Sequence, residues 1–94
     1  MALVDKVDRG AMLLDALEPG WEQQINVDEL DLMHDQDCVL GQLYESYANG
    51  LENLGPIVQE YPVEFGFTKA AGSQRGFATL TRLWKKSIEE RVAA

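Results

Sequence analysis

In this 94-residue chain, the residues best suited to metal binding or catalysis are its one histidine and its one cysteine, which lie four positions apart. On a continuous helix His34 and Cys38 would share a face, with Asp31, Asp35 and Asp37 nearby. Structural zinc needs four convergent ligands, and catalytic zinc usually needs three with an open position. A helix that starts between His34 and Cys38 would break the spacing. We therefore expect no metal ligands here.

Other routes to catalysis are weaker. A Cys/His pair needs a third group that orients the histidine and an element that stabilises an oxyanion, and the sequence indicates neither. The acids of residues 28–37 lack the glycine and closing glutamate of an EF-hand, and the glycines are scattered instead of forming a phosphate-binding loop. We expect no catalytic residues, no cofactor and no enzymatic activity. A metal-dependent enzyme is the weakest alternative.

The charge of the chain is strongly polarised. Residues 10–68 contain no Lys or Arg but twelve acids, whereas residues 69–94 contain six bases and two acids. The formal net charge is −8. The acidic span 10–68 could mimic the phosphate backbone of DNA, and the basic C-terminal part could bind nucleic acid weakly through phosphates. Solvated surface is the simpler interpretation of both, so we do not expect nucleic acid as the partner.

Two groups of side chains are candidates for binding a partner. Arg75, Arg82 and Lys86 would lie within about forty degrees of one another on a C-terminal helix. The second group is aromatic: Tyr61, Phe65 and Phe67. These rings either close the core or leave an exposed apolar patch that a partner could bind.

The apolar periodicity predicts an all-α fold of one domain over residues 1–94, a small bundle of three main helices. The helices are expected over residues 3–17, 37–54 and 73–92, where apolar residues recur at spacings of three and four. Prolines and glycines follow the first two helices, and Ser73 is the expected N-cap of the third. Gly41 and Gly50 suggest close approach of another helix. The expected core is Leu14, Leu17, Trp21, Leu40, Leu43, Tyr47, Leu51, Phe77, Leu80, Trp84 and Ile88.

Two connecting segments leave alternatives open. In residues 21–34, Asp28 could cap a short helical turn, or residues 25–27 could be extended, with Trp21 and Ile25 filling the core. Residues 56–72 form an aromatic loop before the last helix. A turn of helix after Pro56 and an extended piece over residues 63–67 are both compatible with the sequence.

Several short motifs carry a resemblance to a known group of proteins. They are residues 38–44 (CVLGQLY), 19–21 (PGW), 30–32 (LDL), 65–67 (FGF) and 80–84 (LTRLW). The chain resembles small uncharacterised proteins of actinobacteria and their phages. After Tyr44, members of the group have a smaller residue or glycine where this chain has Glu45-Ser46. The resemblance implies an accessory protein that acts in a bacterial cytoplasm.

The leading functional hypothesis is therefore a small acidic protein that binds another protein, such as a host factor. No apolar run reaches the ~20 residues of a membrane span, and residues 1–10 do not resemble a secretory signal. We expect a cytoplasmic protein with no membrane association. Its polarised charge also permits self-association into a homo-oligomer.

Overall fold

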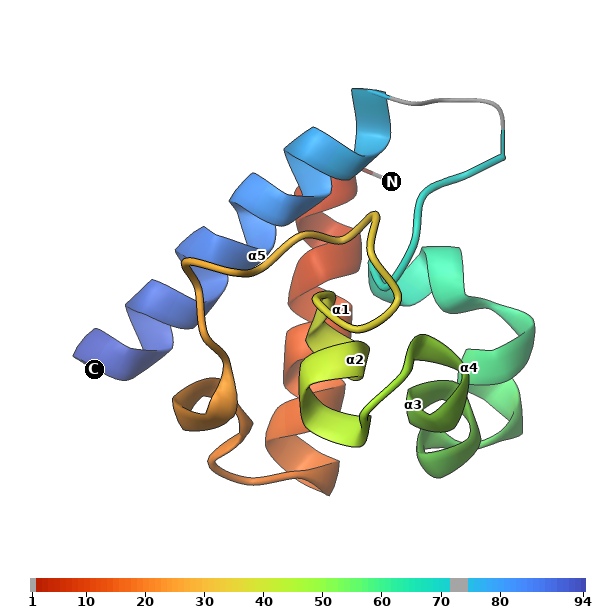
Figure 1. Cartoon of the computed structure of the whole chain (residues 1–94), viewed down its shortest axis with the longest axis horizontal. Coiled ribbons are helices and arrows are strands. Elements are labelled where there is room, and N and C mark those ends of the chain that lie inside the picture. Colours follow the sequence, from red (N-terminus) through yellow and green to blue (C-terminus); the bar gives the residue numbers. More distant parts are fainter. Residues whose placement is uncertain (1, 72–74) are drawn as a thin grey trace.

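The computed structural model describes residues 2–71 and 75–94, apart from the side chain of Arg75. These residues form α- and 3-10 helices and no β-strand, so the prediction of an all-α fold is confirmed at that level (Figure 1). In chain order the elements are α1 (Leu3–Leu17), η1 (Trp21–Gln24), α2 (Val39–Tyr44), α3 (Tyr47–Leu54), α4 (Pro56–Glu60), η2 (Pro62–Phe65) and α5 (Arg75–Ala93).

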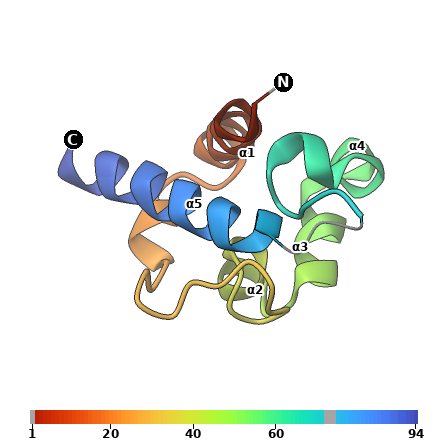
Figure 2. The same ribbon diagram turned by 90° about the horizontal axis from the view of Figure 1, so that it is seen from above.

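The two long helices, α1 and α5, pack against each other through their apolar faces (Figures 1 and 2). The bounds predicted for the first helix are confirmed at both ends. Gly10 is required at the packing interface, because a Cβ atom there would collide with the carbonyl oxygen of Phe65 and come within 3.1 Å of the Trp84 ring. The helix thus approaches both η2 and α5 more closely than any other residue would allow.

Aromatic rings form the centre of the core. Trp21 and Trp84 meet edge to face with their centroids 5.8 Å apart, and Phe67 stacks on Trp84 at 5.6 Å. Both indole N–H groups have acceptors: Trp84 Nε1 donates to the carbonyl of Gly66 at 2.7 Å, and Trp21 Nε1 donates to Asp15 at 2.8 Å. Each tryptophan therefore buries its ring without leaving an unsatisfied donor.

The prediction of one helix over residues 37–54 is wrong. The chain forms α2 and α3, which are separated at Glu45, where φ is +75°. A new helix then begins, and the side chain of its N-cap Ser46 accepts a hydrogen bond from the Asn49 amide at 3.1 Å. The two short helices fold onto each other, so the predicted close approach at Gly50 is confirmed: a Cβ there would lie 2.6 Å from that of Leu40. The description as a bundle of three main helices is therefore not confirmed.

The structure decides the alternatives in the two connecting segments. A 3-10 helix forms at Trp21–Gln24, and the predicted helical turn near residue 28 is instead a hydrogen-bonded turn in which the Glu29 amide donates to the Asn26 carbonyl at 3.2 Å. The turn of helix after Pro56 is confirmed as α4. The extended piece over residues 63–67 is wrong, because Pro62–Phe65 is a 3-10 helix. The predicted N-cap Ser73 lies outside the described residues.

Most of the predicted core is confirmed. Leu17 is the error: its side chain is 52% exposed, because the chain reverses after α1 and Trp21 fills the end of the core instead. Four other predicted members are only half-buried and pack against the core: Leu43, Tyr47, Leu51 and Phe77. The remaining six are buried: Leu14, Trp21, Leu40, Leu80, Trp84 and Ile88.

Candidate functional site

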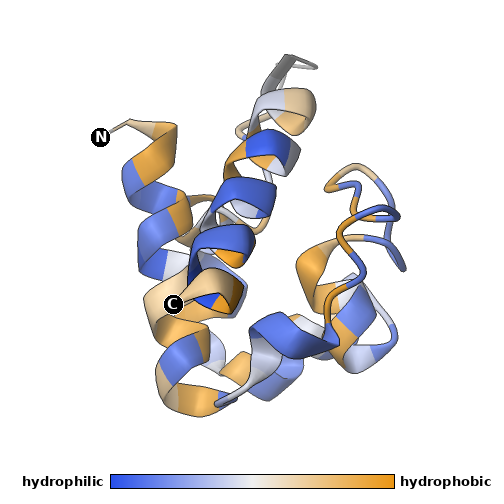
Figure 3. Cartoon of the chain, turned by 90° about the vertical axis from the view of Figure 1, so that its left-hand side faces the viewer, coloured by the Kyte–Doolittle hydropathy of each residue, from blue (hydrophilic) through white to orange (hydrophobic). Residues whose placement is uncertain are grey.

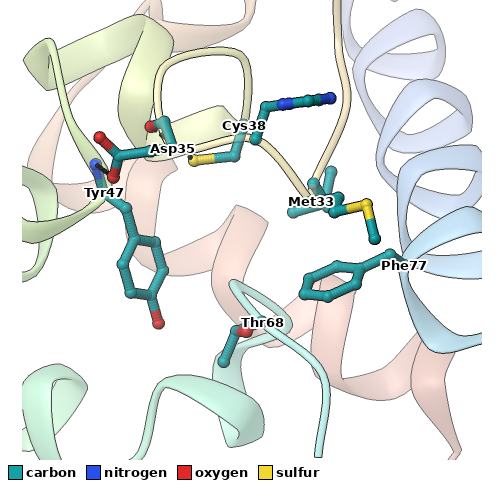
Figure 4. Close-up of a pocket in the computed structure, with 8 residues that line it drawn as sticks. Met33, Asp35, Cys38, Tyr47, Thr68 and Phe77 are labelled. Carbon is teal, nitrogen blue, oxygen red and sulfur yellow. Dashed lines mark hydrogen bonds between the residues drawn. The ribbon is translucent and has the colours of Figure 1, made fainter. Parts of the chain in front are cut away.

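The histidine and the cysteine that were first considered for chemistry line a small pocket of about 180 Å³ (Figure 4). The Cys38 thiol is almost fully buried and is the N-cap of α2. Its sulfur accepts a hydrogen bond from the Gly41 amide at 3.2 Å and donates to the Asp35 carbonyl at 3.5 Å. Burial raises the pKa of the Cys38 thiol. The thiol therefore stays protonated at neutral pH and caps the start of α2.

The other polar groups of this pocket are directed to partners of their own. The imidazole of His34 is largely exposed, and its Nε2 lies 3.4 Å from a carboxylate oxygen of Asp31. Asp35 accepts a hydrogen bond from the backbone amide of Tyr47 at 3.1 Å, at the start of α3. In residues 2–71 and 75–94 no group of three or more His, Cys, Asp or Glu side chains is arranged to hold a metal ion. The geometry thus assigns Asp31 and Asp35 to local structure.

The basic residues predicted to bind a partner lie on α5. Arg82 and Lys86 are both exposed, and the outward surface of this helix is mostly hydrophilic (Figure 3). Arg75 is the first residue of α5, and the position of its side chain is not described. A fourth base, Arg91, is turned toward α1, where it pairs with Asp15 at 3.0 Å.

The three predicted aromatic residues are not brought together on the surface. Tyr61 is 52% exposed at the end of α4. Phe65 is half-buried and stacks on Phe67 with a centroid separation of 6.5 Å. Phe67 itself is only 1% exposed, because it lies between Phe65 and Trp84. Its ring belongs to the core and is not available to a partner.

A different surface lies along one side of α5. The segment that follows η1 runs beside α5 in the opposite direction (Figures 1 and 2). It is fixed there by the Leu32 amide, which donates to the hydroxyl of Thr81 at 3.0 Å, and by the burial of Ile25, Leu30 and Leu32. Two depressions open between this segment and α5, and we call them together the α5 groove.

The distal depression lies near the C-terminal end of α5 and measures about 370 Å³. It is lined by Glu22, Gln23, Ile25, Val27, Ile88, Glu89, Val92 and Ala93. The proximal depression, toward the start of α5, measures about 480 Å³. It is lined by Leu30, Asp31, Met33, Phe77, Ala78 and Thr81. Met33 and Phe77 lie side by side and also line the pocket around Cys38 (Figure 4).

The walls of the α5 groove are mainly apolar, and its edges are mainly acidic. Val92 and Met33 are 50% and 55% exposed, so an apolar side chain is accessible at each depression. The lining acids are Glu22, Asp31 and Glu89, and the exposed Asp28 and Glu29 lie in the turn of segment 26–29 between them. Three bases of the described chain lie near the groove. Lys85 is on the neighbouring part of α5, and the Nζ of Lys69 lies 5.3 Å from the centre of the Phe77 ring. The charge of Arg91 interacts with that of Glu22, although its guanidinium is paired with Asp15. The arrangement suits contact with apolar side chains flanked by positive charge.

Sequence reasoning missed the α5 groove because its second wall has no helical or strand period. The apolar residues Ile25, Val27, Leu30 and Leu32 lie at irregular spacings among acids. Such a pattern indicates an irregular segment that packs on a helix, but it does not indicate which helix. Of the residues that line the groove, Ile25, Phe77 and Ile88 were predicted to be buried, and all three were predicted as part of the core.

Comparisons with known proteins identified no relative of the chain: no family model, curated protein or solved structure matches it. In the described parts of the chain, no helix is both long enough and apolar enough to cross a membrane.

Proposed function

We propose that the chain is a non-enzymatic protein-interaction module that binds a partner protein through the α5 groove. The observation that carries the proposal is the pair of apolar depressions, of about 370 and 480 Å³, on the same side of one helix. The setting we propose is a bacterial cytoplasm, and the partner is a host protein if the chain is encoded by a phage.

The groove has the composition of a binding surface. Protein interfaces place a few apolar anchors in pockets and surround them with polar groups that exclude water. Here the floors are formed by the buried Ile25, Ile88 and Leu30, whereas Val92 and Met33 expose about half of their surface at the edges. A partner that covered these edges would remove apolar surface from water, at about 25 cal/mol per Å².

Site-specific photo-crosslinking in bacterial cells tests this proposal. A benzophenone amino acid at position 92 or 33 should crosslink to a particular protein, which mass spectrometry of the crosslinked band identifies. The matched control is position 57, because Ile57 is 69% exposed but lies outside the groove. The proposal fails if positions 92, 33 and 57 give the same set of crosslinked proteins, or if none gives a distinct band.

A nucleic-acid-related role is the second candidate, and the exposure of Arg82 and Lys86 one turn apart on α5 supports it. Direct phosphate binding should give a gel shift that weakens steeply with salt and is lost in a double R82E/K86E variant. A DNA mimic acting through the acidic span 10–68 should give no shift, and should instead bind a DNA-binding protein. An unshifted band together with specific crosslinks from position 92 would favour the α5 groove.

A further inference from the structure

The two depressions of the α5 groove repeat along α5 with a defined spacing. Phe77 and Thr81 line the proximal depression, and Ile88 and Val92 line the distal one. Each residue of the second pair follows its counterpart in the first by eleven positions. Eleven residues make just over three whole turns of helix, so both pairs face nearly the same way, about 16 Å apart.

Acidic residues outnumber basic residues beside the groove. On the wall opposite α5, the segment 22–34 carries four acids and no base, and the distal depression adds Glu89 from α5 itself. The four are Glu22, Asp28, Glu29 and Asp31. Lys85 is the base that α5 contributes between the two depressions. A ligand that lies in the groove therefore meets negative charge along one side and at the distal end. On the other side it meets Lys85 near the middle and, at the proximal depression, Lys69, whose Nζ lies 5.3 Å from the centre of the Phe77 ring.

We infer that the occupant of the α5 groove is a basic amphipathic helix of the partner protein, laid along α5. This inference rests on the proposed function and adds the chemistry of the partner. Apolar side chains eleven residues apart on such a helix would enter the two depressions, because its rise per residue equals that of α5. Its Lys and Arg residues face the acidic segment 22–34. The described residues contain no strand to which an extended peptide could add, so a helix in a groove is the mode of recognition that the surface offers.

A model peptide tests the inference without knowledge of the natural partner. The probe is a fluorescein-labelled helix of about 16 residues built from Leu and Lys, with Leu on one face, including two positions eleven apart. One control peptide has the same composition in scrambled order, and a second replaces every Lys with Glu. Fluorescence anisotropy at physiological ionic strength should show binding of the probe at least tenfold tighter than of either control.

Variants of the protein show whether the probe occupies the groove. E22Q/E89Q removes two acids from the distal depression, and V92S removes its exposed apolar edge; each should weaken binding at least fivefold. The matched controls lie at exposed positions outside the groove. E52Q/E60Q makes the same change as E22Q/E89Q, and I57S replaces another exposed apolar side chain with serine. These should change affinity less than twofold. All six residues are outside the buried core, and circular dichroism will show that the variants stay folded.

The inference is overturned if the probe does not bind, if the scrambled peptide binds equally well, or if the controls lose as much affinity as the groove variants. The last result would indicate non-specific attraction by the net charge of −8. It is also overturned if sedimentation shows a dimer that E22Q/E89Q and V92S dissociate, because the occupant would then be a second copy of this chain. A specific crosslink from position 92 together with failure of the probe would retain the proposed function and reject the basic helix.

Discussion

Asp15 connects three elements through one carboxylate. It lies on α1, accepts a hydrogen bond from the indole of Trp21 in η1 at 2.8 Å, and accepts two more from the guanidinium of Arg91 in α5, from Nη2 at 3.0 Å and Nε at 3.2 Å. The Arg91 guanidinium lowers the pKa of the Asp15 carboxyl below its ordinary value. The ionised form is therefore favoured by folding.

We predict that Asp15→Asn lowers the free energy of unfolding at pH 7 by about 1 kcal/mol, because the amide keeps an acceptor for Trp21 but loses the charged pair, which is partly screened by solvent. A depressed carboxyl pKa stabilises the fold above the unfolded value of about 3.9. The difference between the wild type and the variant should therefore shrink as the pH falls from about 4 through the lowered pKa. Urea unfolding followed by tryptophan fluorescence measures it.

Asp28→Asn is the matched control for this pH dependence. Asp28 is exposed in a turn, and its carboxylate makes no hydrogen bond with the described residues. Its substitution should leave the unfolding free energy within about 0.5 kcal/mol of the wild type at every pH. An Asp15→Asn effect that persists unchanged at low pH would show that shape, and not charge, is responsible.

At the residue scale, the sequence predicted which large side chains are buried better than it predicted the roles of individual polar residues. Trp84 was expected in the core because it lies on the apolar stripe of the last helix, and Trp21 was expected to fill the core from the segment after the first helix. Cys38 was considered as a ligand, but the structure uses it as a helix cap, because α2 begins at Val39, two residues after the predicted start at residue 37. Which of the two roles Cys38 has depends on where the helix begins. The presence of a single cysteine in the sequence does not indicate that position.

Glu45 determines how the middle of the chain is divided into elements. Its φ of +75° is a conformation that residues with a Cβ adopt at a cost of about 1–2 kcal/mol, and it directs the chain from α2 back into α3. The side chain of Glu45 is exposed, so nothing in the core depends on it.

We predict that Glu45→Gly raises the free energy of unfolding by about 0.5–1 kcal/mol, because relief of the strained backbone outweighs the greater freedom of glycine in the unfolded chain. The control is Glu52→Gly, which makes the same chemical change at an exposed position inside α3. That substitution should lower the unfolding free energy by about 1 kcal/mol. Urea denaturation of both variants provides the comparison, and a loss of stability in both would contradict the role assigned to Glu45.

At the element scale, periodicity predicted α1 correctly because Pro19 and Gly20 end the helix where its apolar stripe ends. Over residues 37–54 the apolar stripe continues through the break, since the two short helices place their apolar residues on the same core. The signal for the break was local: Ser46 is a good N-cap residue, and it was not weighed against the longer pattern. Tertiary packing of Gly50 against Leu40 then makes the reversal compact.

Charge polarity is a property of the whole molecule that the sequence showed directly, but its arrangement in space was not predicted. Folding places Arg91 beside Asp15, and Lys6 and Arg9 near Glu64 at 3.9 and 3.7 Å, so the bases of both ends reach the acidic span. The α5 groove arises in the same way, because it joins residues 22–33 to residues 77–93. The sequence of neither segment indicates that the two will pack against each other.

The balance of these charges predicts how salt affects stability. Each ion pair named above is partly exposed and contributes about 0–1 kcal/mol. The twelve acids of residues 10–68 repel one another over distances that a Debye length of about 30 Å leaves unscreened at 0.01 M salt, and most of them have no base nearby. Repulsion should therefore outweigh pairing. We expect the melting temperature at pH 7 to rise by about 5 °C, or about 1 kcal/mol, between about 0.01 M and about 0.3 M NaCl.

The double substitution E52K/E60K provides the control for this salt effect. It replaces two exposed acids of the acidic span with bases and so halves the magnitude of the net charge without touching the core. Its melting temperature in low salt should exceed that of the wild type, and its rise with NaCl should be smaller, since less repulsion remains to be screened. If the wild type instead melts at a lower temperature as salt increases, the ion pairs of Asp15 and Glu64 are worth more than the repulsion. The ion pairs between the acidic span and the bases near the two ends of the chain would then make a net contribution to the stability of the fold.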